Sequence, residues 1–102
     1  MELTPLNTKQ ALRLYSLLRP HVNGVDLQSA ILLDILDTII RDMVSSGNSM
    51  KYGEAISLMT GLDQSVLVQK QARELLELFM EGIVVNQLPD LIAFGDRLGL
   101  NV

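Results

Sequence analysis

Apolar residues recur along this chain at spacings of three and four, which is the period of an amphipathic helix. In the stretch TKQALRLYSLL, residues 8–18, these positions line one face of a helix. Asn7 precedes the stretch and is a residue type that caps helix N-termini, while Pro20 follows it as a helix breaker. The pattern therefore predicts a first helix that begins after Asn7 and ends at Pro20.

The next periodic segment is the most apolar in the chain. Asp26 is a capping residue type at its start, and Gly47 marks its end after Ser45. Its polar residues fall on one narrow stripe and almost every other position is apolar; the stripe consists of Asp34, Asp37, Thr38, Arg41, Asp42 and Ser45. The pattern predicts a central helix over 26–45 that other elements cover on most sides.

Three further helices are predicted in the second half of the chain. The first covers about 49–60 and is closed by Gly61. The next covers 63–81, and Gly82 is expected just beyond its end. The last covers about 89–99, where its first residue is a proline that fits the first turn of a helix.

No segment alternates as a strand would, apart from the short stretch GIVVNQ, and one short strand cannot form a sheet alone. The fold class is therefore expected to be all-α. We expect residues 1–102 to form a single helical domain, a compact bundle of about five short-to-medium helices.

The predicted connector between the last two helices is unusually apolar, because it begins with Ile83, Val84 and Val85. Connections normally run over the surface and are polar, since their backbone groups need water. Something must therefore cover these side chains. We expect the connector to pack between the two helices, with the adjoining edge of Phe79 and Met80 open to a partner.

Composition and charge narrow the function classes. The chain has a net charge of -4, and an acidic domain does not attract phosphate backbones, so nucleic acid is not expected as a partner. It has no cysteine, which excludes thiolate sites. Its longest uncharged runs are eight residues, short of the roughly 18 that a spanning helix needs, so no membrane contact is expected. We expect a soluble protein of the cytoplasm.

Candidate catalytic and metal chemistry is sparse. His21 is the only imidazole, and its place beside Pro20 predicts a solvated turn residue without a catalytic partner. The chain has no Gly-rich phosphate loop, no Glu-x-x-His pair and no EF-hand spacing. No catalytic, cofactor or metal site is therefore predicted, and we do not expect an enzyme.

Acidic residues form two stripes at helical spacing. Asp34, Asp37 and Asp42 are expected on a solvent face, where Asp37 would pair with Arg41 at i, i+4. The second stripe, at 74–81, consists of Glu74, Glu77 and Glu81. It is compatible with a solvent face and with a dock for a basic partner.

One alternative is a helix-turn-helix that reads DNA, because the stretch YGEAISLMTGLDQSVLVQKQARE has the outline helix, glycine turn, helix. Its second helix would present the polar residues Gln64, Ser65, Gln69, Lys70 and Arg73. The glutamates of the same predicted helix oppose this hypothesis, since they would repel phosphates.

The second half of the chain has more apolar residues than one small core of five helices is expected to bury. A patch of them rimmed by Glu77, Glu81, Asp90 and Asp96 would be typical of a surface for self-association or peptide binding. Met59 and Met80 would let such a surface accept varied helices. The predicted partner-binding residues are Leu75, Phe79, Met80, Ile83, Val84, Leu88 and Phe94.

The stretches EAISLMTGLDQSVL and LLELFMEGIVVNQLPDLIAFGDRLGL together resemble the small tail assembly chaperones of long-tailed bacteriophages. In that family a short helix with a Gly turn precedes a helix that closes on an F-x-E-G end, followed by an Asn connector and a last helix with a central Phe. Here these features correspond to Phe79, Glu81, Gly82, Asn86 and Phe94. The resemblance covers about half of the chain, roughly residues 52–100.

The resemblance implies a non-enzymatic helical protein without cofactors that binds the helical tape measure protein, keeps it soluble and promotes assembly of the tail tube. Its partners would be the tape measure protein, the major tail tube protein and further copies of itself. It would act in the cytoplasm of the infected bacterial host and be absent from the mature virion. A generic helical adaptor or homo-oligomer is the third hypothesis that the sequence leaves open.

Overall fold

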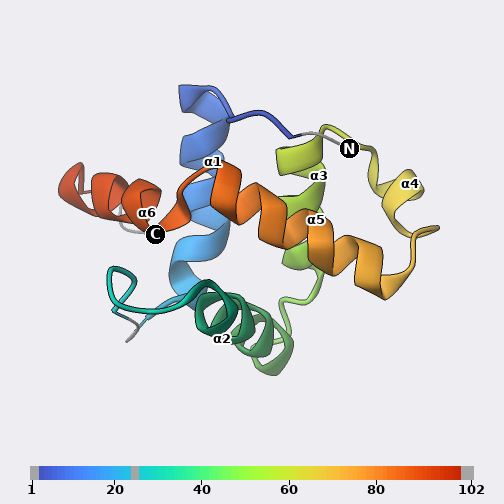
Figure 1. The fold of residues 1–102 in the computed structure, drawn as a ribbon, viewed down its shortest axis with the longest axis horizontal. Helices are drawn as coiled ribbons and strands as arrows, with labels where there is room; N and C mark the ends of the chain where they lie inside the picture. Colours follow the sequence, from blue (N-terminus) through green and yellow to red (C-terminus); the bar gives the residue numbers. More distant parts are fainter. Residues whose placement is uncertain (1–2, 24–25, 100–102) are drawn as a thin grey trace.

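The computed structural model describes residues 3–23 and 26–99, and in these ranges it contains helices and no strand (Figure 1). The all-α prediction is confirmed, and five of the six α-helices are longer than a single turn. In chain order the elements are α1 (Thr8–Leu18), the 3-10 helix η1 (Arg19–His21), α2 (Leu32–Ser45), α3 (Met50–Thr60), α4 (Gln64–Leu67), α5 (Ala72–Val85) and α6 (Leu88–Arg97).

The helices form one bundle around a single core. α3 packs on α5 and on α1, and α6 packs on the other side of α1. α2 packs chiefly on η1 and on α3, and in Figure 1 it crosses the view below α5. The largest fully buried side chains are Leu14, Tyr15, Leu18, Ile39, Met43, Ile56, Phe79, Ile83 and Leu88.

The first helix has the predicted bounds. The Asn7 side chain accepts a hydrogen bond of 2.9 Å from the backbone N–H of Gln10, which satisfies one of the free donors at the start of α1. α1 ends at Leu18, and Pro20 lies within the single 3-10 turn that follows. The sequence pattern is sufficient here because the signals are local.

The second helix begins later than predicted. α2 starts at Leu32, whereas the capping residue type at Asp26 predicted a start there. The Asp26 carboxylate closes a tight turn instead, because it accepts hydrogen bonds from the Gln28 N–H at 3.2 Å and the Ser29 hydroxyl at 2.9 Å. Asp side chains stabilise such turns as readily as helix starts. The predicted end at Ser45 is confirmed.

The single helix predicted over 63–81 is wrong, since the chain there forms two helices. α4 is one turn and places Leu67 in the core. Gln71 then has an extended backbone, with φ -68° and ψ 150°, and α5 begins after it. Neither proline nor glycine occurs at 68–71, so the sequence has no local signal for this break.

The predicted connector is in fact the last turn of α5. Gly82 lies inside this helix, not beyond its end, and it faces α3: a Cβ atom placed on it would lie 2.4 Å from the Met59 Sδ atom. The glycine therefore allows the close approach of two helices. Ile83 is buried in the α5 helix, and Val85 is its last residue.

The true connection between α5 and α6 is two residues long, Asn86 and Gln87. The Asn86 amide nitrogen donates to the Gly82 carbonyl at 2.9 Å, and its Oδ1 accepts from the Leu6 N–H at 2.9 Å, so it caps α5 and holds the N-terminal segment. Gln87 has a left-handed backbone, with φ 48°. The resulting bend between α5 and α6 is 55°.

The contact between α1 and α6 also depends on a glycine. A Cβ atom on Gly95 would lie 2.4 Å from the Tyr15 ring, so the ring lies directly on the α6 backbone. The Tyr15 hydroxyl donates to Asp96 Oδ1 at 2.6 Å, and the Arg19 Nε donates to the same oxygen at 2.9 Å. The hydrogen bonds from Tyr15 and Arg19 hold the pKa of Asp96 below its ordinary value, and the hydrogen bond to Asp96 raises the pKa of Tyr15.

Candidate functional site

Three of the predicted partner-binding residues are core residues in this fold. Phe79, Ile83 and Leu88 are buried, so we exclude them from the candidate surface. The Phe79 ring lies edge-on to the Tyr52 ring, with 5.1 Å between the ring centroids. Phe79 and Ile83 are buried because α5 continues to Val85 and its inner face packs on α3. Met59, expected at an adaptable groove, is buried beneath Gly82.

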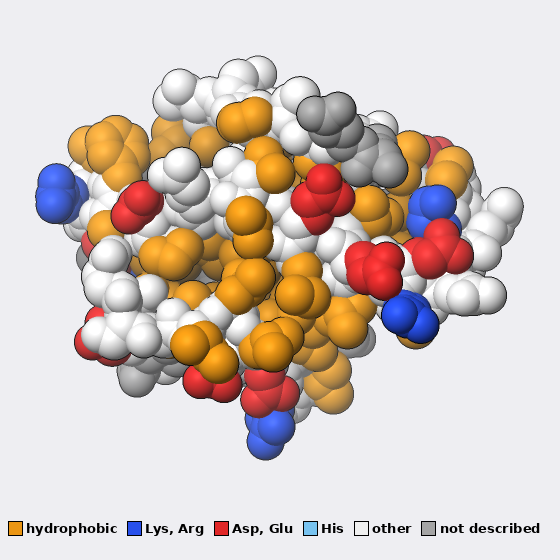
Figure 2. Space-filling model, viewed as in Figure 1, with side chains coloured by type: hydrophobic (Ala, Val, Ile, Leu, Met, Phe, Trp, Pro, Cys, Tyr) orange, Lys and Arg blue, Asp and Glu red, His pale blue; other side chains and the backbone are white. Residues whose placement is uncertain are grey.

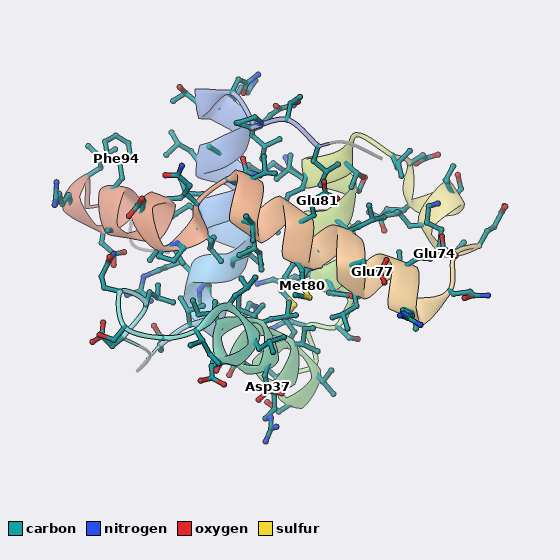
Figure 3. The ribbon with its side chains drawn as sticks, in the orientation of Figure 1. Asp37, Glu74, Glu77, Met80, Glu81 and Phe94 are labelled. Atoms are coloured by element: carbon teal, nitrogen blue, oxygen red, sulfur yellow. The ribbon has the colours of Figure 1, made fainter. Side chains whose placement is uncertain are left out.

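The other four predicted residues do not form one surface. Val84 is 56% exposed on α5, and Leu75 and Met80 on the same helix are partly buried. Phe94 is 50% exposed, but it lies on α6 and points away from α2 (Figure 3). Met80 lies at the edge of α5 that faces α2 in the same view. The structure thus separates Phe94 from Met80 and Val84.

One edge of α5 carries an apolar stripe. Leu76, Met80 and Val84 follow one another at intervals of four residues, so they lie along one side of the helix. Leu76 and Val84 are exposed and Met80 is half-buried. Leu76 is not among the predicted partner-binding residues, although its spacing of four from Met80 indicates the same side of the helix.

One edge of α2 carries a second stripe. Leu33, Ile40 and Val44 lie along it at spacings of seven and four, and Leu33 is 60% exposed. Ile40 and Val44 line a small hollow together with Tyr52 of α3. Asp42 lies on the opposite edge of α2, where it contacts η1. Figure 2 shows apolar side chains that extend over the neighbouring surfaces of α5 and α2. We call the six residues of the two stripes the α2–α5 face.

A hollow of about 360 Å³ lies at one end of the α2–α5 face. It is enclosed by the segment before α2, the end of α5 and the start of α6; its lining residues are Leu27, Gln28, Ala30, Leu32, Ile35, Ile83, Val84, Gln87, Pro89 and Asp90. The lining is mostly apolar. Its volume is near the lower limit of ligand pockets, about 300 to 1,000 Å³, and suits a large apolar side chain.

Carboxylates border the α2–α5 face on both sides. Glu77 and Glu81 each follow a residue of the α5 stripe by one position, so they lie further round that helix. On α2, Asp37 lies four residues after Leu33 and three before Ile40, on the side of the helix away from α5 in Figure 3. The prediction that Asp37 pairs with Arg41 is confirmed, with 3.1 Å between nitrogen and oxygen. Asp90 lines the hollow.

Asp96 was expected on the same rim, but it is bound to Tyr15 and Arg19. It therefore holds α1 and α6 together and does not border the α2–α5 face.

The prediction for His21 is wrong. The residue is 3% exposed, and its Nδ1 lies 2.6 Å from Asp42 Oδ2. Because the carboxylate accepts, Nδ1 carries the proton in this hydrogen bond. The pair joins η1 to α2, and the two residues are too far apart in sequence for a local pattern to reveal it. The opposite ring nitrogen of His21 is buried without a hydrogen-bond partner in the described part of the chain.

The geometry does not favour the DNA-reading alternative. The predicted recognition helix is interrupted, because α4 has four residues and α5 begins only at Ala72. The two basic residues expected to contact DNA lie beside carboxylates: Lys70 is 3.7 Å from Glu74, and Arg73 is 3.4 Å from Glu77. Their charge is thereby partly neutralised.

Residues 3–23 and 26–99 contain no group of three or more acidic or imidazole side chains that could hold a metal ion. No single helix in these ranges is long and apolar enough to cross a membrane; α5 and α6 reach that length and composition only as a bent pair. Comparison with protein-family models, with curated proteins and with solved structures finds no match.

Proposed function

We propose that this chain is a non-enzymatic tail assembly chaperone of a long-tailed bacteriophage. In this role it binds the helical tape measure protein, keeps it soluble in the host cytoplasm and promotes assembly of the tail tube around it. The observation that carries the proposal is the α2–α5 face, an apolar surface with a hollow at one end on an otherwise acidic domain.

The two stripes of the α2–α5 face suit a third helix. Apolar side chains along the edges of two neighbouring helices form the kind of surface into which an amphipathic helix places its apolar edge. Covering each large side chain contributes about 1.5 to 3 kcal/mol before the costs of association. Met80 lies within the surface, and its flexible thioether adapts to different apolar partners.

Binding at this surface would also explain solubility. A long amphipathic helix without its assembly partners exposes its apolar edge to other copies and aggregates. A bound domain covers that edge and adds its own charge of -4 to the complex. Like charge keeps such complexes apart in solution.

The test is co-expression with a tape measure protein predicted from the same genome, followed by size-exclusion chromatography with light scattering. We expect the tape measure protein to be soluble only with this chain, in a complex that holds several copies per tape measure chain. If it stays insoluble and the two elute apart, the proposal is wrong. A defined complex of this chain with itself alone would instead favour the homo-oligomer hypothesis.

Two matched variants locate the contact. Val84→Lys places a charge in the α2–α5 face, whereas Val68→Lys places the same charge between α4 and α5, where Val68 is 80% exposed. A lysine near the C-terminus of α5 interacts favourably with the helix dipole, so Val84→Lys should fold. We expect Val84→Lys to lose the tape measure protein and Val68→Lys to retain it. Equal behaviour of the two variants would place the contact elsewhere.

A further inference from the structure

The charges around the α2–α5 face specify what its occupant must look like. We propose that the face recognises an amphipathic helix with Lys or Arg along both edges of its apolar stripe and one large apolar side chain that enters the hollow. This inference rests on the same surface as the proposed function, and it adds the chemistry by which the partner segment is selected.

Carboxylates border the α2–α5 face along both of its helices. Glu77 and Glu81 border the face along α5 and Asp37 borders it along α2 (Figure 3). Asp34 follows Leu33 of the α2 stripe by one position, so an occupant lying between these helices has acids on both sides. Opposite charges placed along an interface raise the association rate and select among partners. An occupant with acidic edges would be repelled on both sides.

These carboxylates are available to pair with basic residues of an occupant. Glu81 and Asp34 make no ion pair among the described residues. Glu77 and Asp37 pair with Arg73 and Arg41, but both arginines are largely exposed and four residues from their partners. Such surface pairs contribute little, so an incoming Lys or Arg can replace them.

The side chains at the edges of an occupant must be long enough to meet the carboxylates that border the face. Packed helices lie about 8 to 10 Å apart, so charged groups at the edges of an occupant have to extend past its apolar stripe to meet the carboxylates. Lys and Arg do so, because their aliphatic stems lie along apolar surface while the charged ends remain in water. Basic residues at the occupant's edges thus satisfy both the apolar face and its border.

The hollow has room for one large apolar side chain of the occupant. Ile35 and Ile83 are buried in its lining, and Val84 and Pro89 also line it. A large side chain inserted there exchanges water for apolar contacts, and well-packed pockets of this kind are where single residues dominate binding. Asp90 at the same site places a further carboxylate beside the anchor. We therefore expect one Phe, Leu or Met of the occupant to act as the anchor.

The experiment uses three synthetic helical peptides with the same apolar stripe and a central Phe. Their edge positions are Lys, Gln or Glu, and binding to the full chain is measured by fluorescence anisotropy at low and high salt. We expect the Lys peptide to bind about tenfold tighter than the Gln peptide at low salt and the Glu peptide not to bind. The advantage of Lys should shrink at high salt, because ions screen exposed charges.

Matched variants test the two parts of the inference. Glu81→Gln should weaken the Lys peptide about two- to fivefold at low salt, whereas Glu54→Gln, on α3 and away from the face, should not. Replacing the central Phe of the peptide with Ala should weaken binding about tenfold or more. Circular dichroism of the variants confirms that both retain the helical fold.

The outcomes separate this inference from the proposed function. If all three peptides bind equally, the charge selection is wrong even where the tape measure protein is made soluble. If the Lys peptide alone binds but the tape measure protein stays insoluble, the inference stands and the proposed function falls. If Phe→Ala leaves binding unchanged, the anchor in the hollow is wrong.

Discussion

The two sides of α5 are built from similar apolar residues but have opposite outcomes. On one side Gly82 lets α5 approach α3 so closely that Met59 lies against its backbone, and Phe79 and Ile83 are buried. On the other side α5 faces α2, and Val84 remains 56% exposed. Composition alone does not distinguish these two sides.

The difference arises from what holds α2. α2 packs chiefly on η1 and α3, and the His21–Asp42 hydrogen bond of 2.6 Å binds it to η1. α2 therefore does not cover the outer edge of α5, and apolar residues on both helices remain available. Apolar surface thus remains exposed on α5 and α2, because α2 is held in place by η1 and α3 and not by α5.

The largest effect is expected when the two sides of α5 are compared by the same truncation. Phe79→Ala should lower the free energy of unfolding by about 3 to 5 kcal/mol, because it leaves a cavity beside Tyr52. Val84→Ala should lower it by only about 0.5 kcal/mol, since an exposed side chain loses little on truncation. Urea unfolding of both variants measures the contrast, and equal losses would show that Val84 is also a core residue.

The next effect compares the two glycine contacts. Gly95→Ala should cost about 2 kcal/mol, since the new methyl group meets the rigid Tyr15 ring. Gly82→Ala should cost about 1 kcal/mol, because the Met59 thioether can move and alanine favours the helix. Thermal and urea unfolding give the order of the two variants. A stabilised Gly95→Ala protein would contradict the close contact between α1 and α6.

The smallest effect concerns the pH dependence of the Tyr15–Asp96 contact. Because the folded state lowers the pKa of Asp96, its stabilising contribution is present above the unfolded value of about 3.9 and is lost as the pH falls through the lower folded value. Asp96→Asn should therefore be less stable than the natural chain at neutral pH, and the difference should shrink below about pH 4. Urea unfolding across acidic pH checks this, and a constant difference would exclude the linkage.

Much of the fold could be predicted from local patterns in the sequence. The periodic spacing predicted α1, α3 and most of α2 and α6, because one face of each helix packs on the core. Two of the errors arise at residues that are compatible with two structural roles. Asp26 stabilises a turn as well as it would a helix start, and Gly82 serves helix packing, although the pattern indicated a helix end. The local sequence is compatible with a turn or a helix start at Asp26, and with helix packing or a helix end at Gly82.

The candidate surface could be predicted only in part. Met80 and Val84 were identified because apolar residues were in excess, but Phe79 and Ile83 look the same in sequence and are core. Which side of α5 is buried depends on Met59, which lies far along the chain. Leu33 was not identified, because its exposure follows from the contact of α2 with η1. The spacing of apolar residues along the chain does not predict such long-range contacts.

The hydrogen bonds from Leu6 to Asn86 and from Tyr15 to Asp96 join residues 80 and 81 positions apart, and this has a consequence during synthesis. At about 5 to 20 residues per second, the ribosome needs roughly 4 to 16 s to make the intervening chain. An isolated helix as short as α1 is marginal in water. α1 can pack on α3 as soon as α3 is made, but the two hydrogen bonds that fix the start of the chain form only after the last two helices have been synthesised.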